Sequence, residues 1–325
     1  MYDMLLSKRL TSLLAILGLS VLVLFSILGG HKHTSVLTSP KQASIFFRSG
    51  SSEKNPSIPP QLSPAHQMPD EPEILAQSFL VQLINDSTPL LSRRSFKQMR
   101  PASLTKILTS VLAIEELDEN APVVFSSFAK SAGEKESPVP VGEAFIRDNA
   151  VRFAIIESAN DAAVALAEAM GRKRGAFSFD DAIALFVQRA NQKAKSLGME
   201  NSQFQNPTGL DDDKHYTTAE DLFRLVSYAW KNHPEIWNFS RANEADINSL
   251  THTTYHIIAT NQLLNEFPAL LGGKTGLTDK AKGALILLYP IKPDRVAVII
   301  ILGSDDRFED GKKLIQWLEE GFRNS

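Results

Sequence analysis

The stretch Pro101-Ala-Ser-Leu-Thr-Lys106 is followed by an apolar run at helical spacing, formed by Ile107, Leu108, Val111, Leu112 and Ile114. This spacing predicts a helix that begins at or just before Ser103 and carries Ser103 and Lys106 on adjoining turns of one face. A hydroxyl at a helix N-terminus lies among unpaired backbone N–H groups, and a lysine kept neutral by its surroundings can take its proton. The pattern is typical of acyl transfer by serine with lysine as the base.

The Ser-x-x-Lys pattern is weak alone, because it also occurs at Ser51/Lys54 and Ser127/Lys130. Its surroundings favour Ser103. A strand-like run at 79–84 precedes it, a Pro-Ala pair leads into it, and an amphipathic helix follows it.

Composition excludes several classes of protein. The chain has 325 residues, of which 43% are hydrophobic, enough for the core of one large or two smaller domains. A net charge of -3 argues against a nucleic-acid-binding surface. Cysteine is absent, which removes thiol nucleophiles, cysteine-based zinc sites and disulfides from consideration.

The amino-terminal region predicts membrane attachment. Residues 10–30 carry no charge, and at about 1.5 Å rise per residue they can cross a hydrocarbon core of roughly 30 Å. Lys8 and Arg9 precede this run, so we expect residues 1–9 to form a cytoplasmic tail, with the remainder exported. A cleaved signal peptide is the alternative. The run ends Ile27-Leu-Gly-Gly-His-Lys-His without an Ala-x-Ala site, which favours an uncleaved signal-anchor at 10–30.

Residues 31–73 are rich in Ser, Pro, Gln and Lys, a composition that predicts a disordered linker. A folded domain is expected over 74–325. Its predicted strands are 78–84, 90–93, 271–277, 283–289 and 295–303. Its predicted helices are 148–156, 162–170, one from Asp180 to Gly198, one started by a Thr217/Glu220 capping box and ending near 230, and 308–322.

This order of elements predicts an α+β fold. One antiparallel sheet is formed by both chain ends and flanked by helices, and an all-helical subdomain is inserted between them. Residues 120–145 are interpreted as loop and short strands, because Pro138, Pro140 and Gly142 interrupt them.

Three short patterns follow one another in the chain: Ser103-Leu-Thr-Lys106, Ser158-Ala-Asn160 and Lys274-Thr-Gly276. Ser158-Ala-Asn160 lies at a break between two predicted helices, and Lys274-Thr-Gly276 lies in a predicted strand of the terminal sheet. Each pattern is weak singly, but the three together, in this order and in these settings, are specific.

On these residues the chain resembles the penicillin-recognising serine D,D-peptidases, most closely the low-molecular-weight D-alanyl-D-alanine carboxypeptidases of bacterial wall metabolism. The likeness covers roughly 75–322. It extends to the stretches Ser158-Ala-Asn-Asp-Ala-Ala, Leu197-Gly-Met, Phe204-Gln-Asn-Pro-Thr-Gly-Leu, His215-Tyr-Thr-Thr-Ala and Lys274-Thr-Gly-Leu-Thr-Asp-Lys-Ala. It implies a β-lactamase/transpeptidase-like fold and removal of the terminal D-alanine from peptidoglycan stem peptides.

The resemblance implies a role for each motif residue. Ser103 would attack the carbonyl of the penultimate D-alanine and become acylated. Lys106 would be the base, with its pKa lowered by burial and by the charge of Lys274. Ser158 and Asn160 would pass the proton to the leaving D-alanine and hold the peptide of the substrate.

The remaining roles fall on the Lys-Thr-Gly strand. Lys274 and Thr275 would bind the terminal carboxylate, and Gly276 would let the substrate lie along the strand edge. The backbone N–H groups of Ser103 and Leu277 would form the oxyanion hole. The resemblance implies no metal and no cofactor, and it implies β-lactam antibiotics as covalent inhibitors.

Some stretches depart from the family or have a simpler interpretation. Ala281-Lys282-Gly283 has an extra or shifted residue, and Thr208 replaces the commoner histidine.

The turn at Asn206-Pro-Thr-Gly-Leu is interpreted as structural, and His215 as a packing or capping residue. His252 and His256 are spaced as metal ligands on a helix can be, but the accompanying Glu of a zinc peptidase is missing.

Other functions remain open from the sequence. A D,D-endopeptidase would use the same residues, although relatives of that kind often carry Glu where this chain has Ala159. A β-lactamase would need a deacylating Glu-x-x-Leu-Asn motif, which does not follow Ser158. A penicillin-binding scaffold without turnover is the third alternative. Many relatives attach through a C-terminal segment; here the amino-terminal segment is expected to hold the enzyme on the bacterial cytoplasmic membrane, with its catalytic domain on the periplasmic side.

Overall fold

The computed structural model describes residues 68–292 and 294–323. The predicted tail, the signal-anchor at 10–30 and most of the linker lie outside the described residues. Within the part described, no helix combines the length and the apolar character that a bilayer crossing requires. The described end of the predicted linker contacts the domain: the Trp317 indole donates to the Pro69 carbonyl at 3.0 Å, Arg93 pairs with Glu71 at 2.6 Å, and Lys313 donates to the Glu73 carbonyl at 3.1 Å.

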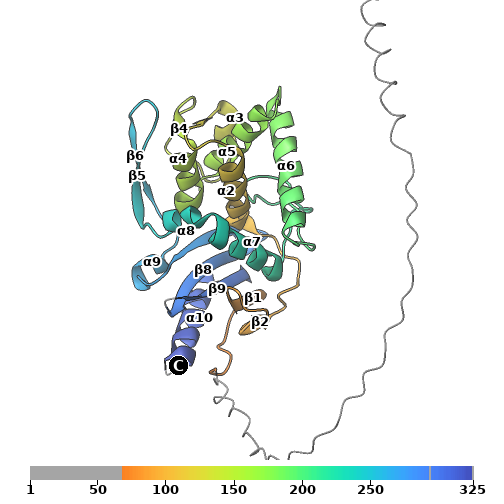
Figure 1. Cartoon of the computed structure of the whole chain (residues 1–325), viewed down its shortest axis with the longest axis vertical. Helices are drawn as coiled ribbons and strands as arrows, with labels where there is room; N and C mark the ends of the chain where they lie inside the picture. The colour runs from red at the N-terminus through yellow and green to blue at the C-terminus, as the bar shows by residue number, and fades with distance from the viewer. Residues whose placement is uncertain (1–67, 293, 324–325) are drawn as a thin grey trace, which may run out of the picture. The chain divides into compact units, whose positions relative to one another are not determined.

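The core of the fold is a five-stranded sheet in the order β2-β1-β9-β8-β7 (Figure 1). Its strands are β1 (Ser78–Leu83), β2 (Leu91–Arg93), β7 (Gly272–Thr278), β8 (Lys282–Lys292) and β9 (Arg295–Ser304). All pairings are antiparallel, and β1 pairs with β9 along its whole length. The predicted sheet built from both chain ends is therefore confirmed.

Alternation along the strands divides the core into two layers. Phe79, Val81 and Leu83 of β1 belong to the same hydrophobic cluster as Leu314 and Leu318 of the final helix α10 (Arg307–Phe322). The alternate strand residues face the helices on the other side of the sheet. Figure 1 shows α10 on one side of the sheet and the larger group of helices on the other.

The inserted subdomain carries most of the helices. They are η1 (Ala102–Leu104), α2 (Thr105–Glu116), α3 (Ser127–Lys130), α4 (Arg147–Arg152), η2 (Phe153–Glu157), α5 (Asn160–Lys173) and α6 (Phe179–Ser196). They are joined by a two-stranded pair, β3 (Pro122–Val124) with β4 (Ala144–Ile146), in the region where the sequence indicates short strands. Helix α7 (Ala219–Asn232) returns the chain to the sheet, where it packs on β9 and β1.

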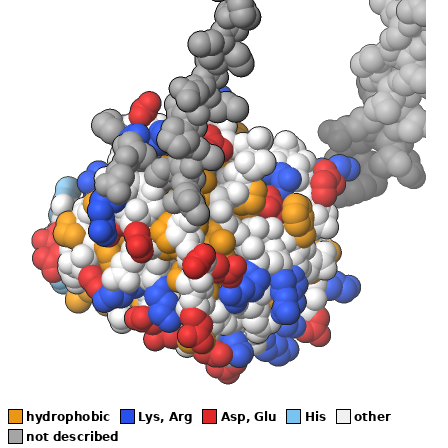
Figure 2. Space-filling model, turned by 90° about the horizontal axis from the view of Figure 1, so that it is seen from below, with side chains coloured by type: hydrophobic (Ala, Val, Ile, Leu, Met, Phe, Trp, Pro, Cys, Tyr) orange, Lys and Arg blue, Asp and Glu red, His pale blue; other side chains and the backbone are white. Residues whose placement is uncertain are grey.

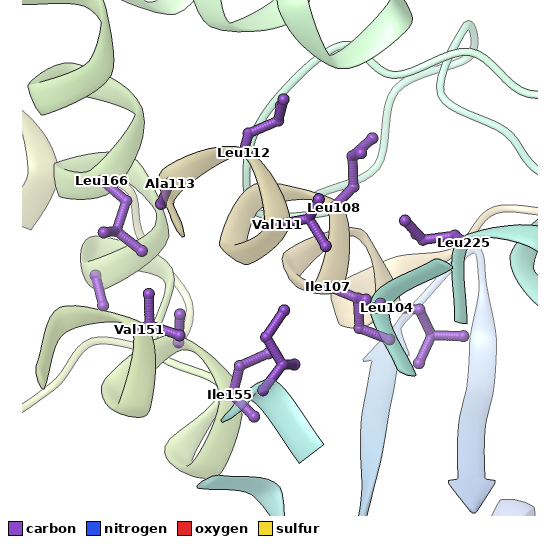
Figure 3. Packing of buried hydrophobic residues seen from close by; sticks show 14 of the residues in the cluster. Leu104, Ile107, Leu108, Val111, Leu112, Ala113, Val151, Ile155, Leu166 and Leu225 are labelled. Carbon is purple, nitrogen blue, oxygen red and sulfur yellow. The ribbon is translucent and has the colours of Figure 1, made fainter. Parts of the chain in front are cut away.

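Helix α2 lies at the centre of this subdomain and is buried along most of its length. Figure 3 shows its side chains Leu108 and Val111 among residues from the neighbouring helices, including Ile155 and Leu225. Burying each such side chain contributes about 2 kcal/mol, so the position of α2 is strongly fixed. The residues at the N-terminus of α2, next to Ser103, are therefore held in place as well.

Two helix starts differ from the predicted ones. Ser178, not Asp180, caps α6 and forms a capping box with Asp181. Thr218 caps α7 through the Asp221 N–H, so the predicted Thr217/Glu220 box is one residue early. The reason is backbone geometry: Ser178 and Thr218 have the extended conformation that a cap requires, whereas Thr217 forms a bridge with Met99.

The chain between α7 and the sheet contains elements that the sequence did not predict. They are α8 (Pro234–Ser240), the hairpin β5 (Glu244–Asn248) with β6 (Thr254–Ile258), and α9 (Leu263–Glu266). His252 lies in the hairpin turn and His256 in β6, so the two do not share a helix face. Within the described ranges, no group of three or more His, Cys, Asp or Glu side chains is placed to hold a metal ion.

The irregularity at Ala281-Lys282-Gly283 falls on the turn between β7 and β8. Lys282 has a positive φ of 58° and stands opposite Thr278, and the register shifts between Gly283 and Leu285. The pairing of β7 with β8 stays in register through Lys282, so the departure is confined to the turn, whereas the shift belongs to the pairing of β8 with β9. On the face seen in Figure 2, acidic and basic side chains are interspersed, and no broad basic patch gathers there.

The packing of α5 on α6 gives a stability test. A Cβ added at Gly171 would lie 2.4 Å from the Cα of Ala182, so Gly171→Ala must push the two helices apart. We expect a loss of about 2 kcal/mol in the free energy of unfolding, measured by chemical denaturation. Ala184→Ser, on the exposed side of α6, is the control and should change stability by less than about 0.5 kcal/mol. Equal stability of the two variants would contradict this account of the packing.

Candidate active site

Ser103 lies in the 3₁₀ turn η1 that immediately precedes α2. The Lys106 ammonium donates to the Ser103 hydroxyl at 2.9 Å, so the predicted contact between the two side chains is present. The turn is tight, with φ of 49° at Ala102. Ser103 is partly exposed, whereas Lys106 is fully buried behind it.

Three acceptors surround the Lys106 nitrogen: the Ser103 hydroxyl at 2.9 Å, Asn160 Oδ1 at 2.7 Å and the Thr208 carbonyl at 2.8 Å. Burial lowers the pKa of Lys106 to about 7, and the positive charge of Lys135 adds to the effect. In its neutral form the amine keeps two N–H groups for Asn160 and Thr208 and turns its lone pair to the Ser103 hydroxyl. Lys106 can therefore take the serine proton near neutral pH.

A positive charge that no sequence pattern predicts also acts on Lys106. Lys135 lowers the pKa of Lys106 in addition to the effect of burial. Lys274 is itself fully buried, and burial lowers its pKa well below the usual range, with Lys106, Lys135 and Arg307 contributing. Its neighbours are the Ser158 hydroxyl at 2.6 Å and the Thr275 carbonyl at 2.9 Å.

Ser158 and Asn160 lie at a break between helices, as the sequence indicates. The short π-helix η2 ends at Glu157, and Ser158 follows in the left-handed conformation with φ of 66°. Asn160 then begins α5 and points its amide at Lys106. The strained turn places one hydroxyl and one amide on the same side of the hollow.

The Lys274-Thr-Gly strand β7 forms the edge of the sheet. A Cβ at Gly276 would lie 2.9 Å from the Cβ of Ala102 and 3.1 Å from the backbone nitrogen of Ser103. Glycine is thus needed because the turn that carries Ser103 approaches the strand so closely. Leu277, the next residue, is exposed at the edge.

These elements enclose a pocket of about 270 Å³. Six of the eight predicted site residues line it: Ser103, Ser158, Asn160, Thr275, Gly276 and Leu277. The other two, Lys106 and Lys274, lie buried beneath it and contact Ser103 and Ser158. The structure therefore brings together side chains that are more than 100 residues apart in the chain.

Thr208 shows that the Asn206-Pro-Thr-Gly-Leu turn has more than a structural role. The Asn206 side chain accepts from the backbone N–H groups of Thr208 and Gly209, which fixes the turn. The turn aims the Thr208 carbonyl at Lys106. Gly209 has φ of 88° and packs on the Ala102 carbonyl, so no side chain fits there. Because this acceptor is a backbone carbonyl, no residue type in the sequence predicts it.

Other pocket residues belong to none of the three motifs, among them Glu134, Lys135, Thr260 and Arg307. Thr260 follows the β5–β6 hairpin; its N–H donates to the Ile156 carbonyl at 3.1 Å and its hydroxyl lies 2.5 Å from that of Thr275. It thereby joins the Ser158 side of the pocket to the β7 side. Lys135 and Arg307 add positive charge to the lining.

His215 lies behind the nucleophile turn, outside the pocket lining. Its ring packs edge-on against Phe204, and its Nε2 is 3.1 Å from the Thr105 hydroxyl. Burial lowers the pKa of His215 to about 4, so the ring is neutral at physiological pH. This environment matches the packing role predicted for it.

Comparison with known proteins gives consistent results. A family model described as D-alanyl-D-alanine carboxypeptidase, Peptidase_S11, matches residues 65–305. The D-alanyl-D-alanine carboxypeptidase DacF of Bacillus subtilis is 30% identical over 238 residues, which cover 72% of this chain and 58% of the relative. A D-alanyl-D-alanine endopeptidase of Pseudomonas aeruginosa is 30% identical over 266 residues, which cover 79% of this chain and 82% of the relative.

Solved structures support the fold. The Streptomyces K15 DD-transpeptidase superposes with a TM-score of 0.71 at 22% identity, covering 77% of this chain and 99% of that one. A penicillin-binding protein homologue from Mycobacterium tuberculosis gives a TM-score of 0.67 at 24% identity, covering 78% and 94%. At this level of identity the likeness concerns the fold alone.

The charge state of Lys106 gives a test of the site. Acylation of Ser103 by a fluorescent penicillin should become faster as pH rises through about 7 and then level off, because only the neutral amine accepts the proton. Lys106→Arg stays charged and should slow labelling by about 100-fold or more. The surface change Lys173→Arg is the control. A flat profile between about pH 5 and pH 9 would show that Lys106 is not the base.

Proposed function

The chain belongs to the D-alanyl-D-alanine carboxypeptidase family, Peptidase_S11, and from this we propose that it is a serine D,D-carboxypeptidase that removes the terminal D-alanine from peptidoglycan stem peptides. The chain spans 58% of the length of the Bacillus carboxypeptidase that it matches. The observation that carries the proposal is the Lys106 amine, which lies 2.9 Å from the Ser103 hydroxyl at the base of a pocket.

Acylation follows from this contact. Ser103 Oγ attacks the carbonyl carbon of the penultimate D-alanine while its proton passes to neutral Lys106. The carbon–nitrogen bond of the scissile peptide then breaks, and the proton taken up by Lys106 passes through the Ser158 hydroxyl, which Lys274 contacts at 2.6 Å, to the leaving D-alanine nitrogen, so that Lys106 is neutral again. Water later attacks the ester, releases the shortened peptide and restores the Ser103 hydroxyl.

Backbone groups stabilise the charge that develops on the carbonyl oxygen. The N–H groups of Ser103 and Leu277 form the proposed oxyanion hole, and both residues line the pocket. The approach of Gly276 to the backbone nitrogen of Ser103 supports this pairing, since it keeps the two segments adjacent. One such donor commonly contributes on the order of 100-fold in rate.

The terminal carboxylate of the substrate is assigned to the side of the pocket that carries basic side chains. Thr275 provides a hydroxyl at the strand edge, while Lys274 lies directly beneath, and Lys135 and Arg307 border the same hollow. Basic side chains gathered around a small cavity favour an anionic end group. A free D-alanine carboxylate meets this requirement.

A D,D-endopeptidase is the second candidate, because this chain covers 82% of the Pseudomonas endopeptidase. Ala159 favours the carboxypeptidase, because endopeptidase relatives often carry Glu at this position. Mass analysis of products from a D-Ala-D-Ala-ended peptide and from a crosslinked dimer separates the two. A β-lactamase would release a labelled penicillin quickly, and a scaffold without turnover would release no D-alanine.

Two substitutions test the proposed roles. Ser103→Ala should abolish both penicillin labelling and D-alanine release, whereas Ser127→Ala, in another Ser-x-x-Lys pattern, should leave both unchanged. Lys274→Ala should raise KM by about tenfold or more for a peptide with a free carboxylate, and less for its C-terminal amide, because a bound carboxylate favours the protonated form of Lys274 and alanine cannot supply that charge. Equal effects on acid and amide would contradict the carboxylate role.

We also infer that residues 10–30 anchor the enzyme in the bacterial cytoplasmic membrane, with the catalytic domain on the periplasmic side. The length and charge pattern of this segment support the inference. The full chain should sediment with membranes and be digested by protease added from outside the membrane. A chain that starts at residue 68 should stay in the supernatant and retain penicillin labelling. A full chain found in the supernatant would contradict the anchor.

A further inference from the structure

The turn Gly133-Glu134-Lys135 is bound directly to the catalytic amide of Asn160. The Asn160 Nδ2 donates to the Gly133 carbonyl at 3.0 Å, and the Asn160 backbone N–H donates to the Lys135 carbonyl at 2.7 Å. With Nδ2 engaged by Gly133, the amide must turn its Oδ1 to Lys106, where the distance is 2.7 Å. The turn therefore fixes the orientation of Asn160.

The same turn is strained and faces the pocket. Gly133 and Glu134 have positive φ values of 70° and 61°, and the second is unfavourable for a residue with a side chain. Such a conformation persists only where surrounding contacts hold it, and here the two hydrogen bonds from Asn160 do so. As a result, the side chains of Glu134 and Lys135 both line the pocket that holds Ser103.

Resting on the proposed function, we propose that Lys135 is a positioning residue for acylation: its backbone carbonyl holds Asn160, which contacts Lys106, and its side chain brings a positive charge to the lining of the same pocket. Lys135 belongs to none of the three motifs. It acts on the reacting groups through Asn160 and through its electric field.

The charges around Lys106 are consistent with this role. Lys135 lowers the pKa of Lys106, whereas Asp161 and Glu134 raise it. Asp161 is already paired with Lys130 at 2.6 Å and accepts from Ser137, which reduces its effect on the amine. Lys135 and Arg307 also lower the pKa of Lys274, the other buried lysine.

Glu157 is the acidic group that opposes the lowering of the Lys135 pKa. Its negative charge raises the pKa of Lys135, against burial and Arg307, which lower it. Burial raises the pKa of the Glu157 carboxyl to about 7, and its Oε2 is buried without a hydrogen-bond partner in the part of the chain described. Both Lys106 and Glu157 therefore change charge near neutral pH, so a test must separate them.

The experiment compares the pH dependence of penicillin acylation in the full chain and in Lys135→Met, Lys135→Arg and Glu157→Gln. Loss of the charge in Lys135→Met should move the rising limb to higher pH by on the order of half a unit, with the plateau unchanged. Lys135→Arg keeps the charge and should follow the wild type. The limb should persist in Glu157→Gln, because Lys106 produces it. None of these changes alters the Lys135 carbonyl that holds Asn160.

Two outcomes would overturn the proposal. A Lys135→Met profile that superposes on the wild type, or that is lowered by the same factor at every pH, would leave no role for the charge at Lys106. A limb that disappears in Glu157→Gln would assign the titration to Glu157.

A direct readout separates this inference from the proposed function. NMR titration of the Lys106 side chain in the wild type and in Lys135→Met, each with a thermal melt to verify folding, reports the same shift without any turnover. An unshifted titration overturns the inference. A shifted titration in a chain that releases no D-alanine supports the inference and contradicts only the carboxypeptidase activity.

Discussion

The arrangement of the site depends on the burial of one amine, that of Lys106. Lys106 is fully enclosed, yet its nitrogen meets three oxygen atoms from three separate segments, at Ser103, Asn160 and Thr208. Burying a charged amine away from water costs free energy, and this lowers the pKa of Lys106 to about 7. The packed helix α2, the Asn206 turn and the first residue of α5 all act to hold this arrangement.

The second lysine is held by the sheet. Strand β7 lies at the sheet edge, paired on one side with β8, and presents Lys274 inward and Leu277 outward. The two lysines come from different elements, α2 and β7, and contact Ser103 and Ser158 respectively. The Thr260 hydroxyl lies beside that of Thr275 and its N–H donates to the Ile156 carbonyl, so it joins the Ser158 side of the pocket to β7.

Side-chain chemistry at fixed spacing made the motif residues predictable, since a hydroxyl and an amine one helical turn apart lie close enough to exchange a proton. The sheet formed by both chain ends was predictable, because apolar strand patterns occur in both of those regions. Backbone contributions were not predictable: the Thr208 carbonyl and the Lys135 carbonyl carry no residue-type signal. The charge of Lys135 acts on Lys106 through space, so no sequence pattern predicts its effect. The β5–β6 hairpin was missed because its Thr-rich sequence lacks clear apolar alternation, and the helix caps were misplaced where neighbouring residues compete.

Strands β1 and β9 pair along their length, although more than 200 residues separate them. Ser103 enters the polypeptide early, whereas Lys274, Thr275 and the strands that support them come late. A chain still being synthesised therefore has Ser103 but neither the edge strand nor Lys274. The site is complete only once β8 and β9 have joined β7 to the strand at the other end of the chain.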